Sequence, residues 1–280
     1  MNKKVIALVK ASAHQFYFVN KIHKEYPLAL VIIEDKYLGE LPALKRLQAR
    51  RALGPRYIAK PHASNRIKSK TLVSINDDIF GEDWLDLEND LKVFYCKSVN
   101  SPEVENLLKQ EKPDVLIDHG TSIVKDHIID LAPMAINLHW GLSPYYRGTR
   151  CTEWALINWD PYNIGVTIHW LTKKIDGGGV IAQERLALNE EDSVHTINMK
   201  LSFHGTQLVL DTIKAINRGE EIQSEQQDHA LGYLTLNRQW TKSLKEQIKE
   251  IEANDIITKM LKHPARREKM PIKSFEINNS

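Results

Sequence analysis

Short apolar runs alternate with amphipathic segments along most of the chain. Val5 to Val9 and Leu28 to Ile33 are apolar runs of strand length, and a helical pattern from about Ser12 to Glu25 lies between them. Lys92 to Tyr95 and Pro113 to Gly120 are further strand candidates, the second ending in a glycine turn. Strands that alternate with helices predict a mostly parallel sheet with helices on both faces. The expected fold class is α/β, with a Rossmann-like twisted sheet.

The second half of the chain continues the alternation and then changes character. Strands are predicted over Ala135–Trp140, 164–171 and 180–188. Helices are predicted over 149–159 and from Ser101, with Pro102 at its first position, and residues 38–70 hold a helical segment followed by a polar stretch near Pro55 and Pro61. Asp192-Ser193 is expected to cap a long amphipathic helix that ends at Gly219. Beyond it we expect a short strand at 232–234 and a charged helix over 241–262. We therefore predict a catalytic domain over 1–219, with core motifs at 113–210, and a small C-terminal extension over 220–280.

Polar side chains that could carry chemistry gather near the middle of the chain. Asn137 and His139 are two residues apart, so a strand over 135–140 directs both side chains to one face. Asp176 stands in a turn before Gly177-Gly178-Gly179 and could fold back against that pair. The alternative is that a lone Asn or His at a strand end is a satisfied core residue and that the glycine-rich turn is a plain hairpin.

Composition narrows the class of protein. The chain has 280 residues, 42% hydrophobic and 26% charged, which is ordinary for a globular protein, and its formal charge of +2 does not indicate a phosphate-binding basic surface. Cys96 and Cys151 are too few for a disulfide framework or a thiolate metal site. No apolar run reaches the roughly 18 residues of a membrane span, and we expect a cytoplasmic protein. The first strand lacks a following G-x-G-x-x-G, which disfavours a dinucleotide cofactor.

Four motifs in order resemble the folate-dependent N-formyltransferases. They are N-x-H at 137–139, L-S-P-x-x-R-G at 142–148, G-V-T-x-H at 165–169 and D-G-G at 176–178, and the likeness is strong over about 113–210. This family includes glycinamide ribonucleotide transformylases, methionyl-tRNA formyltransferases and sugar N-formyltransferases. The resemblance implies a catalytic triad of Asn137, His139 and Asp176 and N10-formyltetrahydrofolate as co-substrate, with no metal.

The resemblance also implies a mechanism and a set of binding residues. A substrate amine attacks the formyl carbon directly, and a tetrahedral intermediate is stabilised by Asn137, His139 and Asp176. Asp176 orients His139, which takes part in proton transfer. The folate pocket is expected to include Gly120, Thr121, Ser122, Ile123, Val124, Ile175 and Gly177. Tyr146 and Arg147 are candidates for substrate binding. For Arg147, fixing the loop after His139 is an equally weighted alternative to contacting the substrate. Thr167 and His169 are expected to have structural roles.

The substrate is predicted from two features in which this chain differs from other members of the family that it resembles. Val9 to Gln15 replaces the phosphate loop of glycinamide ribonucleotide transformylases, and the segment after Gly219 lacks the strand signals of a tRNA-binding barrel. A nucleotide-linked amino sugar is therefore favoured as the substrate, and no nucleic-acid or membrane partner is expected. The C-terminal segment could also mediate formation of a homodimer. The alternatives are a hydroxylated amino acid of siderophore type or another amine, hydrolysis of formyltetrahydrofolate, and a non-catalytic binding protein. The hydrolase usually carries an additional N-terminal domain, whereas this chain begins directly with its first strand.

Overall fold

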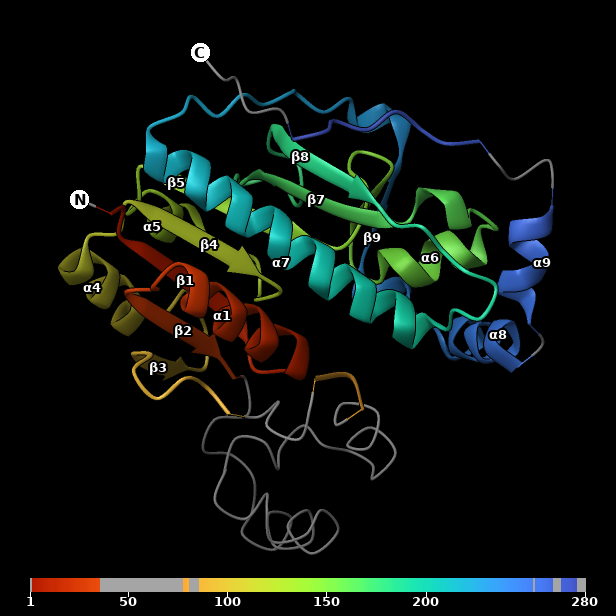
Figure 1. The fold of residues 1–280 in the computed structure, drawn as a ribbon, viewed down its shortest axis with the longest axis horizontal. Helices are drawn as coiled ribbons and strands as arrows, with labels where there is room; N and C mark the ends of the chain where they lie inside the picture. Colours follow the sequence, from red (N-terminus) through yellow and green to blue (C-terminus); the bar gives the residue numbers. More distant parts are fainter. Residues whose placement is uncertain (1, 36–77, 81–85, 254, 264–267, 276–280) are drawn as a thin grey trace, which may run out of the picture. The chain divides into compact units, whose positions relative to one another are not determined.

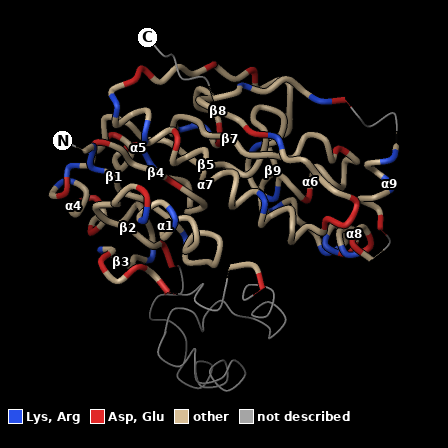
Figure 2. Tube along the Cα trace, viewed as in Figure 1, with Lys and Arg blue, Asp and Glu red and all other residues tan. Residues whose placement is uncertain are grey.

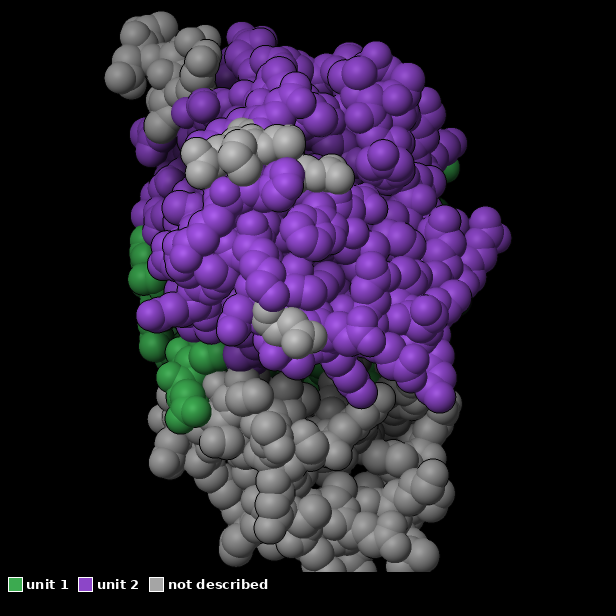
Figure 3. All heavy atoms as spheres, turned by 90° about the vertical axis from the view of Figure 1, so that its right-hand side faces the viewer, with its two compact units in different colours: residues 1–135 green, residues 136–280 purple. Residues whose placement is uncertain are grey.

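The structure is a computed structural model that describes residues 2–35, 78–80, 86–253, 255–263 and 268–275. The chain divides into two compact units, residues 1–135 and residues 136–280, which Figure 3 colours green and purple. The predicted division at residue 219 is a different one and stays a prediction. The helical segment and polar stretch predicted within 38–70 lie outside the described residues.

The first unit is built on four parallel strands. They are β1 (Val5–Lys10), β2 (Leu30–Glu34), β3 (Val93–Cys96) and β4 (Val115–His119), in the order β3-β2-β1-β4. Helix α1 (Ala13–Glu25) connects β1 to β2, α4 (Pro102–Glu111) connects β3 to β4, and the short α5 (Asp126–Ile129) follows β4 (Figure 1). The predicted cap of α4 is confirmed, because the Ser101 hydroxyl accepts a bond from Val104 N and Pro102 is the first helical residue.

The second unit has antiparallel pairing in its larger group of strands. β7 (Gly165–Trp170) lies between β5 (Met134–His139) and β8 (Val180–Arg185) and is antiparallel to both. The 25-residue helix α7 (Val194–Arg218) packs against β7 and β8 (Figure 1). A capping box at Ser193 begins α7 and Gly219, at φ 81°, ends it, as the sequence predicted.

A separate two-stranded sheet joins the middle of the second unit to its C-terminal part. β6 (Tyr146–Gly148) pairs in parallel with β9 (Tyr233–Thr235), although 84 residues lie between the two strands. The surrounding elements are α6 (Cys151–Ile157) and the short 3-10 turns η3 (Pro161–Asn163), η4 (His229–Leu231) and η5 (Asn237–Gln239). The C-terminal segment after α7 is therefore part of the fold around the 146–148 strand.

The C-terminal helix differs from its prediction. The structure has two helices, α8 (Lys242–Ala253) and α9 (Ile256–Lys262), where one helix over 241–262 was expected. Asp255 has φ 51°, in the left-handed region, and such a residue cannot continue a right-handed helix. The strand predicted over 180–188 ends earlier, at Arg185, and the helix predicted over 149–159 is limited to Cys151–Ile157.

The predicted α/β class, with mostly parallel pairing and a C-terminal helical part, is confirmed. Lysine and arginine are interspersed with aspartate and glutamate along the described chain, and α8 carries both signs (Figure 2). Within the described ranges, no helix combines the length and the apolar character needed to cross a lipid bilayer.

Candidate active site

Two antiparallel strands of the second unit place four polar side chains together. In the register of β5 and β7, Asn137 is opposite His169, and His139 is opposite Thr167. All four side chains are buried, with exposed fractions of 7% or less. Because residues two apart on a strand share a face, the alternation predicted for Asn137 and His139 also holds for Thr167 and His169.

His169 contacts Asn137 directly. The Nδ1 of His169 lies 2.8 Å from the carbonyl oxygen of Trp170, which can only accept, so this nitrogen carries a proton. In the neutral ring Nε2 then accepts a bond from the Asn137 amide nitrogen at 3.0 Å. The pair fixes which end of the Asn137 amide carries the NH₂ group. His169 was expected to be structural, and the structure places it inside the candidate site.

Asp176 folds back against both imidazoles. Its Oδ2 lies 3.4 Å from His139 Nδ1 and its Oδ1 lies 3.4 Å from His169 Nε2. Oδ2 also accepts a 2.6 Å bond from the backbone N–H of Gly148. The structure thus brings Asn137, His139 and Asp176 together, and their chemical roles stay a prediction.

Both ring nitrogens of His139 face acceptors. Nε2 lies 3.0 Å from the carbonyl oxygen of Tyr146 and therefore donates to it, whereas Nδ1 faces the Asp176 carboxylate. Burial lowers the pKa of His139, and Asp176 only partly offsets this by favouring the charged ring. A neutral His139 with its proton on Nε2 consequently presents the Nδ1 lone pair to the carboxylate. A proton arriving at Nδ1 is stabilised there.

The Asp176 carboxylate is held in its charged form. Burial alone would raise its pKa, but the neighbouring His139 and His169 rings and the Gly148 N–H outweigh burial. The pKa of Asp176 therefore lies well below its ordinary value. The site has a permanent negative charge next to an imidazole of lowered basicity.

The loop between β5 and β6 is held closely around His139. Thr167 Oγ1 donates to the carbonyl oxygen of Gly141 at 2.6 Å and accepts from Ser143 N at 3.1 Å. A side chain at Gly141 would overlap the His139 ring, so this position requires glycine. Gly141 is a residue that the motif analysis did not single out, and its signal was its place directly after the strand end.

Tyr146 and Arg147 are both inside the protein, with exposed fractions of 3% and 7%. The Tyr146 hydroxyl donates to Asp160 at 2.8 Å, and burial raises its pKa well above the ordinary value. The Arg147 guanidinium donates to the carbonyl oxygens of Pro144 and His229 at 3.3 and 3.2 Å. These contacts hold the loop, and the substrate contacts predicted for both residues stay predictions.

The residues predicted to bind folate are divided between the two units. In the first unit Gly120 follows β4 with φ 77°. Ser122 donates through its backbone N–H to Glu34 at 2.8 Å, and the Ile123 carbonyl oxygen accepts from Asn100 at 2.9 Å. The other members of the 120–124 loop are Thr121, which donates to Asp118 and to the Ser122 carbonyl, and the buried Val124. The side chain of Ile123 is 61% exposed.

In the second unit Ile175 and Gly177 flank Asp176. Gly177 N donates to the Lys174 carbonyl oxygen at 3.1 Å, which closes the turn. A Cβ at Gly177 would lie 2.7 Å from Lys174 Cβ and 3.0 Å from the His229 ring. Folate binding by both residues stays a prediction.

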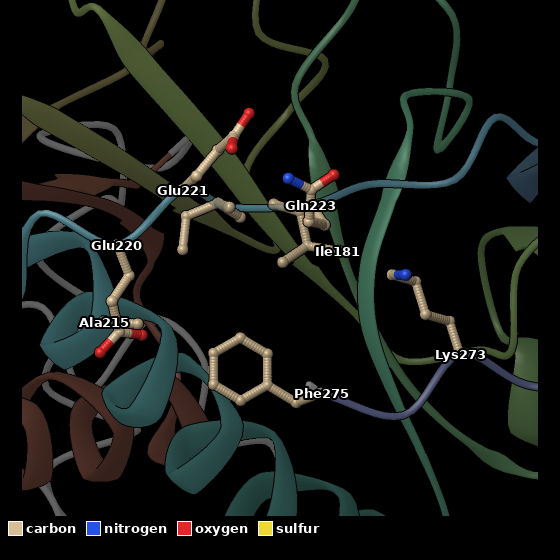
Figure 4. Close-up of a pocket in the computed structure, with 8 residues that line it drawn as sticks. Ile181, Ala215, Glu220, Glu221, Gln223, Lys273 and Phe275 are labelled. Carbon is tan, nitrogen blue, oxygen red and sulfur yellow. The ribbon is translucent and has the colours of Figure 1, made fainter. Parts of the chain in front are cut away.

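Residues after α7 reach the candidate site, which the sequence analysis did not foresee. The Gln227 side chain bonds the backbone on both sides of Gly177, and Thr235 bonds the backbone on both sides of Gly148. No motif marks these residues, because their partners are 49 to 88 positions away in the chain. A separate pocket near the end of α7 holds only about 50 Å³ and includes Ala215, Lys273 and Phe275 (Figure 4). Drug-sized ligands need roughly 300 Å³ or more, so this pocket is too small for a folate.

Comparison with known proteins shows the family. The Formyl transferase family model matches residues 60–213, more than half of the 280 residues. A sugar N-formyltransferase from Shewanella sp. is 14% identical with a TM-score of 0.54, over 89% of this chain and 87% of that one. A 4-N formyltransferase from Francisella tularensis is 17% identical with a TM-score of 0.53, over 99% of both chains. HypX from Aquifex aeolicus, in complex with tetrahydrofolic acid, is 11% identical with a TM-score of 0.51, over 88% of this chain and 31% of that one.

At these identities the solved structures show a shared fold, and the family model carries the assignment. The predicted enzyme class, an N-formyltransferase, is confirmed, and this chain belongs to the formyl transferase family.

Proposed function

We propose that this formyltransferase transfers the formyl group of N10-formyltetrahydrofolate to the primary amine of a nucleotide-linked amino sugar. The observation that carries the proposal is the cluster of Asn137, His139 and Asp176, in which Asn137 and His139 are buried and His139 Nδ1 meets the Asp176 carboxylate at 3.4 Å. The name of the Shewanella structure, a sugar N-formyltransferase, supports a sugar amine as acceptor, and the tetrahydrofolic acid of the Aquifex structure supports the donor.

The donors and acceptors of the site fit a formyl transfer. The folate supplies a formyl group whose oxygen gains negative charge when an amine attacks. In the proposal the Asn137 amide donates to that oxygen, with its orientation set by His169. Removing one such donor from an enzyme typically costs about 3 kcal/mol, or roughly 100- to 1000-fold in rate.

His139 serves as the proton carrier in this proposal. The Nε2 proton is held by the Tyr146 carbonyl, so Nδ1 is the atom that takes up a proton released by the attacking amine. Asp176 faces that nitrogen and stabilises the charged ring while it exists. The same proton is then available to the departing nitrogen, which leaves the protein unchanged after each cycle.

Direct attack by the amine is favoured over a covalent enzyme intermediate. Cys151 Sγ lies 3.5 Å from His139 Nε2, so the site does contain a thiol next to an imidazole. Burial raises the pKa of the Cys151 thiol well above its ordinary value, which suppresses the nucleophilic thiolate. His139 Nε2 donates its proton to Tyr146 and is not oriented as a base toward the sulfur.

The roles of the remaining predicted residues belong to the proposal. The loop over 120–124, with Ile175 and Gly177, is assigned to the folate, and Tyr146 and Arg147 to the rim of the acceptor site. A cytoplasmic location, a homodimeric assembly and the lack of a nucleic-acid partner remain predictions. A hydroxylated amino acid as acceptor and hydrolysis of formyltetrahydrofolate remain the alternatives.

The test is release of tetrahydrofolate from formyltetrahydrofolate in the presence of nucleotide-linked amino sugars, followed by absorbance and by mass of the product. The proposal expects amine-dependent release and a product heavier by one formyl group. Release without any amine indicates the hydrolase, and full activity of an Asn137→Ala, His139→Ala double variant excludes the proposed site.

A further inference from the structure

The main chain of the Asp176 turn is held by a residue from the C-terminal segment. Asp176 has φ 45°, a left-handed conformation that residues with a side chain adopt rarely and at a cost of about 1–2 kcal/mol. The Gln227 side-chain nitrogen donates to the carbonyl oxygen of Asp176 at 2.8 Å and to that of Gly178 at 2.6 Å. One NH₂ group thus binds the carbonyl oxygens of the two residues on either side of Gly177.

The carboxylate of Asp176 depends on the same segment through a second route. Its closest donor is the Gly148 N–H, at 2.6 Å. Gly148 belongs to β6 and is paired with Thr235 of β9. Thr235 is buried, and its hydroxyl bonds the carbonyl oxygens of Arg147 and Thr149 at 3.1 and 2.7 Å.

The segment from Glu225 to Thr235 is itself anchored at both ends. Glu225 exchanges two backbone bonds with Val180, at 2.7 and 2.8 Å, directly after the glycine turn. At the other end Thr149 N donates to the Thr235 carbonyl oxygen at 2.9 Å. Both routes to Asp176 therefore start from one short segment, which lies outside the 60–213 match to the family model.

The amide of Gln227 can only fit in one orientation. Both of its partners are carbonyl oxygens, which accept and never donate, so the nitrogen must face them. Among the described residues, its Oε1 is buried without a hydrogen-bond partner. A buried acceptor left unpaired costs about 1–3 kcal/mol, which the fold tolerates here to keep the nitrogen on the turn.

We propose that Gln227 is a positioning residue for catalysis: it holds the Asp176 turn so that the carboxylate stays against His139. This inference rests on the proposed function, in which His139 carries the proton. It gives the segment after α7 a role at the reacting centre.

The main test is Gln227→Ala in the full-length chain, with Gln226→Glu as a control at the exposed neighbouring residue. The expected result is a fall in kcat of about 10- to 100-fold, because a small displacement of a catalytic group has an effect of this size. The KM values for both substrates should change less than about twofold, since Gln227 contacts neither in the proposal. The control should keep the kcat of the natural sequence.

A second measurement separates positioning from a merely structural role. The His139 imidazole is titrated by ¹H–¹⁵N NMR and assigned with His139→Gln. The ring is faced by Asp176, His169, Arg147, the Cys151 thiol and the Tyr146 carbonyl. Asp176 is the one anion in that set, so its displacement should move the His139 midpoint to lower pH in Gln227→Ala.

The outcomes decide the matter separately from the proposed function. An unchanged kcat, an unchanged His139 midpoint, or a fall in thermal stability alone would overturn the inference. If Gln227→Ala does not fold, Gln227→Glu is the second variant, and it should recover activity on acidification as its carboxyl regains a donor proton. If the natural sequence lacks formyl transfer, the proposed function fails, whereas the NMR titration still tests whether Gln227 holds Asp176 against His139.

Discussion

Replacing Asp176 by asparagine removes the negative charge of the site and leaves its shape. The carbonyl oxygen of the new amide can still accept from Gly148 N–H, which now meets Oδ2 at 2.6 Å. That same oxygen would face His139 Nδ1, where the carboxylate Oδ2 lies at 3.4 Å, and the amide nitrogen would take the place of Oδ1 beside His169. A proton on His139 Nδ1 would then face an uncharged carbonyl oxygen in place of a carboxylate, so the charged ring would lose the negative charge that stabilises it.

The size of the effect follows from the distance between the charges. Two unit charges 3.4 Å apart interact by up to about 5 kcal/mol at the effective dielectric constant of 20 that suits protein sites. This corresponds to at most between about three and four orders of magnitude in the ratio of protonated to neutral imidazole. Since general acid–base catalysis by one group contributes about 10²- to 10⁴-fold, Asp176→Asn should lower kcat within that range.

The assay follows tetrahydrofolate release at saturating amine between about pH 6 and 9, across the range where histidine titrates. A thermal melt of the same samples by circular dichroism verifies that the fold is intact. The variant should melt cooperatively and remain folded at the assay temperature, because the substitution keeps the Gly148 bond. A folded variant with kcat within about threefold of the original would show that the carboxylate does not support proton transfer.

Three further outcomes can be measured on the same protein. The pKa of Asp176 in the folded protein lies below its unfolded value of about 3.9, so the carboxylate stabilises the fold above that pH. Urea unfolding should therefore show a larger free energy of unfolding for the natural sequence than for Asp176→Asn, and this difference should vanish as the pH falls through the acid range. Burial raises the pKa of Cys96 to about 12 and that of Cys151 well above its usual value. Neither thiol should therefore react quickly with a thiol reagent until the protein is unfolded, and rapid labelling of the native protein would contradict this. Gly148→Ala should lower the free energy of unfolding by about 2 kcal/mol or more, because φ is 95° and the added Cβ would overlap the Thr235 carbonyl. The control Gly219→Ala, where φ is 81° and the Cβ would meet open space, should lower it by only about 1 kcal/mol. Equal losses in the two variants would refute the role of the Thr235 contact.

Local sequence rules determined the elements that depend on neighbouring residues. The N-cap at Ser193 and the glycine at 219 bound α7 correctly, since a capping box and a left-handed C-terminal residue act within one helical turn. The strand period placed Asn137 and His139 on one face for the same reason. The folate-family motifs added the expectation that Asp176 joins them, and the structure brings the three together.

Contacts between distant residues were decided only by the tertiary structure. His169 enters the site because the antiparallel register of β5 and β7 sets it opposite Asn137, and strand period alone cannot select a register. Gln227 and Thr235 reach Asp176 and Gly148 from the far side of a 25-residue helix, and a polar residue in a connecting segment carries no local signal of its partner. The sequence by itself thus determined the ends of α7, the shared face of Asn137 and His139 and the chemistry of the motifs. The folded chain decided which side chains hold that chemistry in place, because hydrogen bonds across dozens of residues form only when packing brings their partners together.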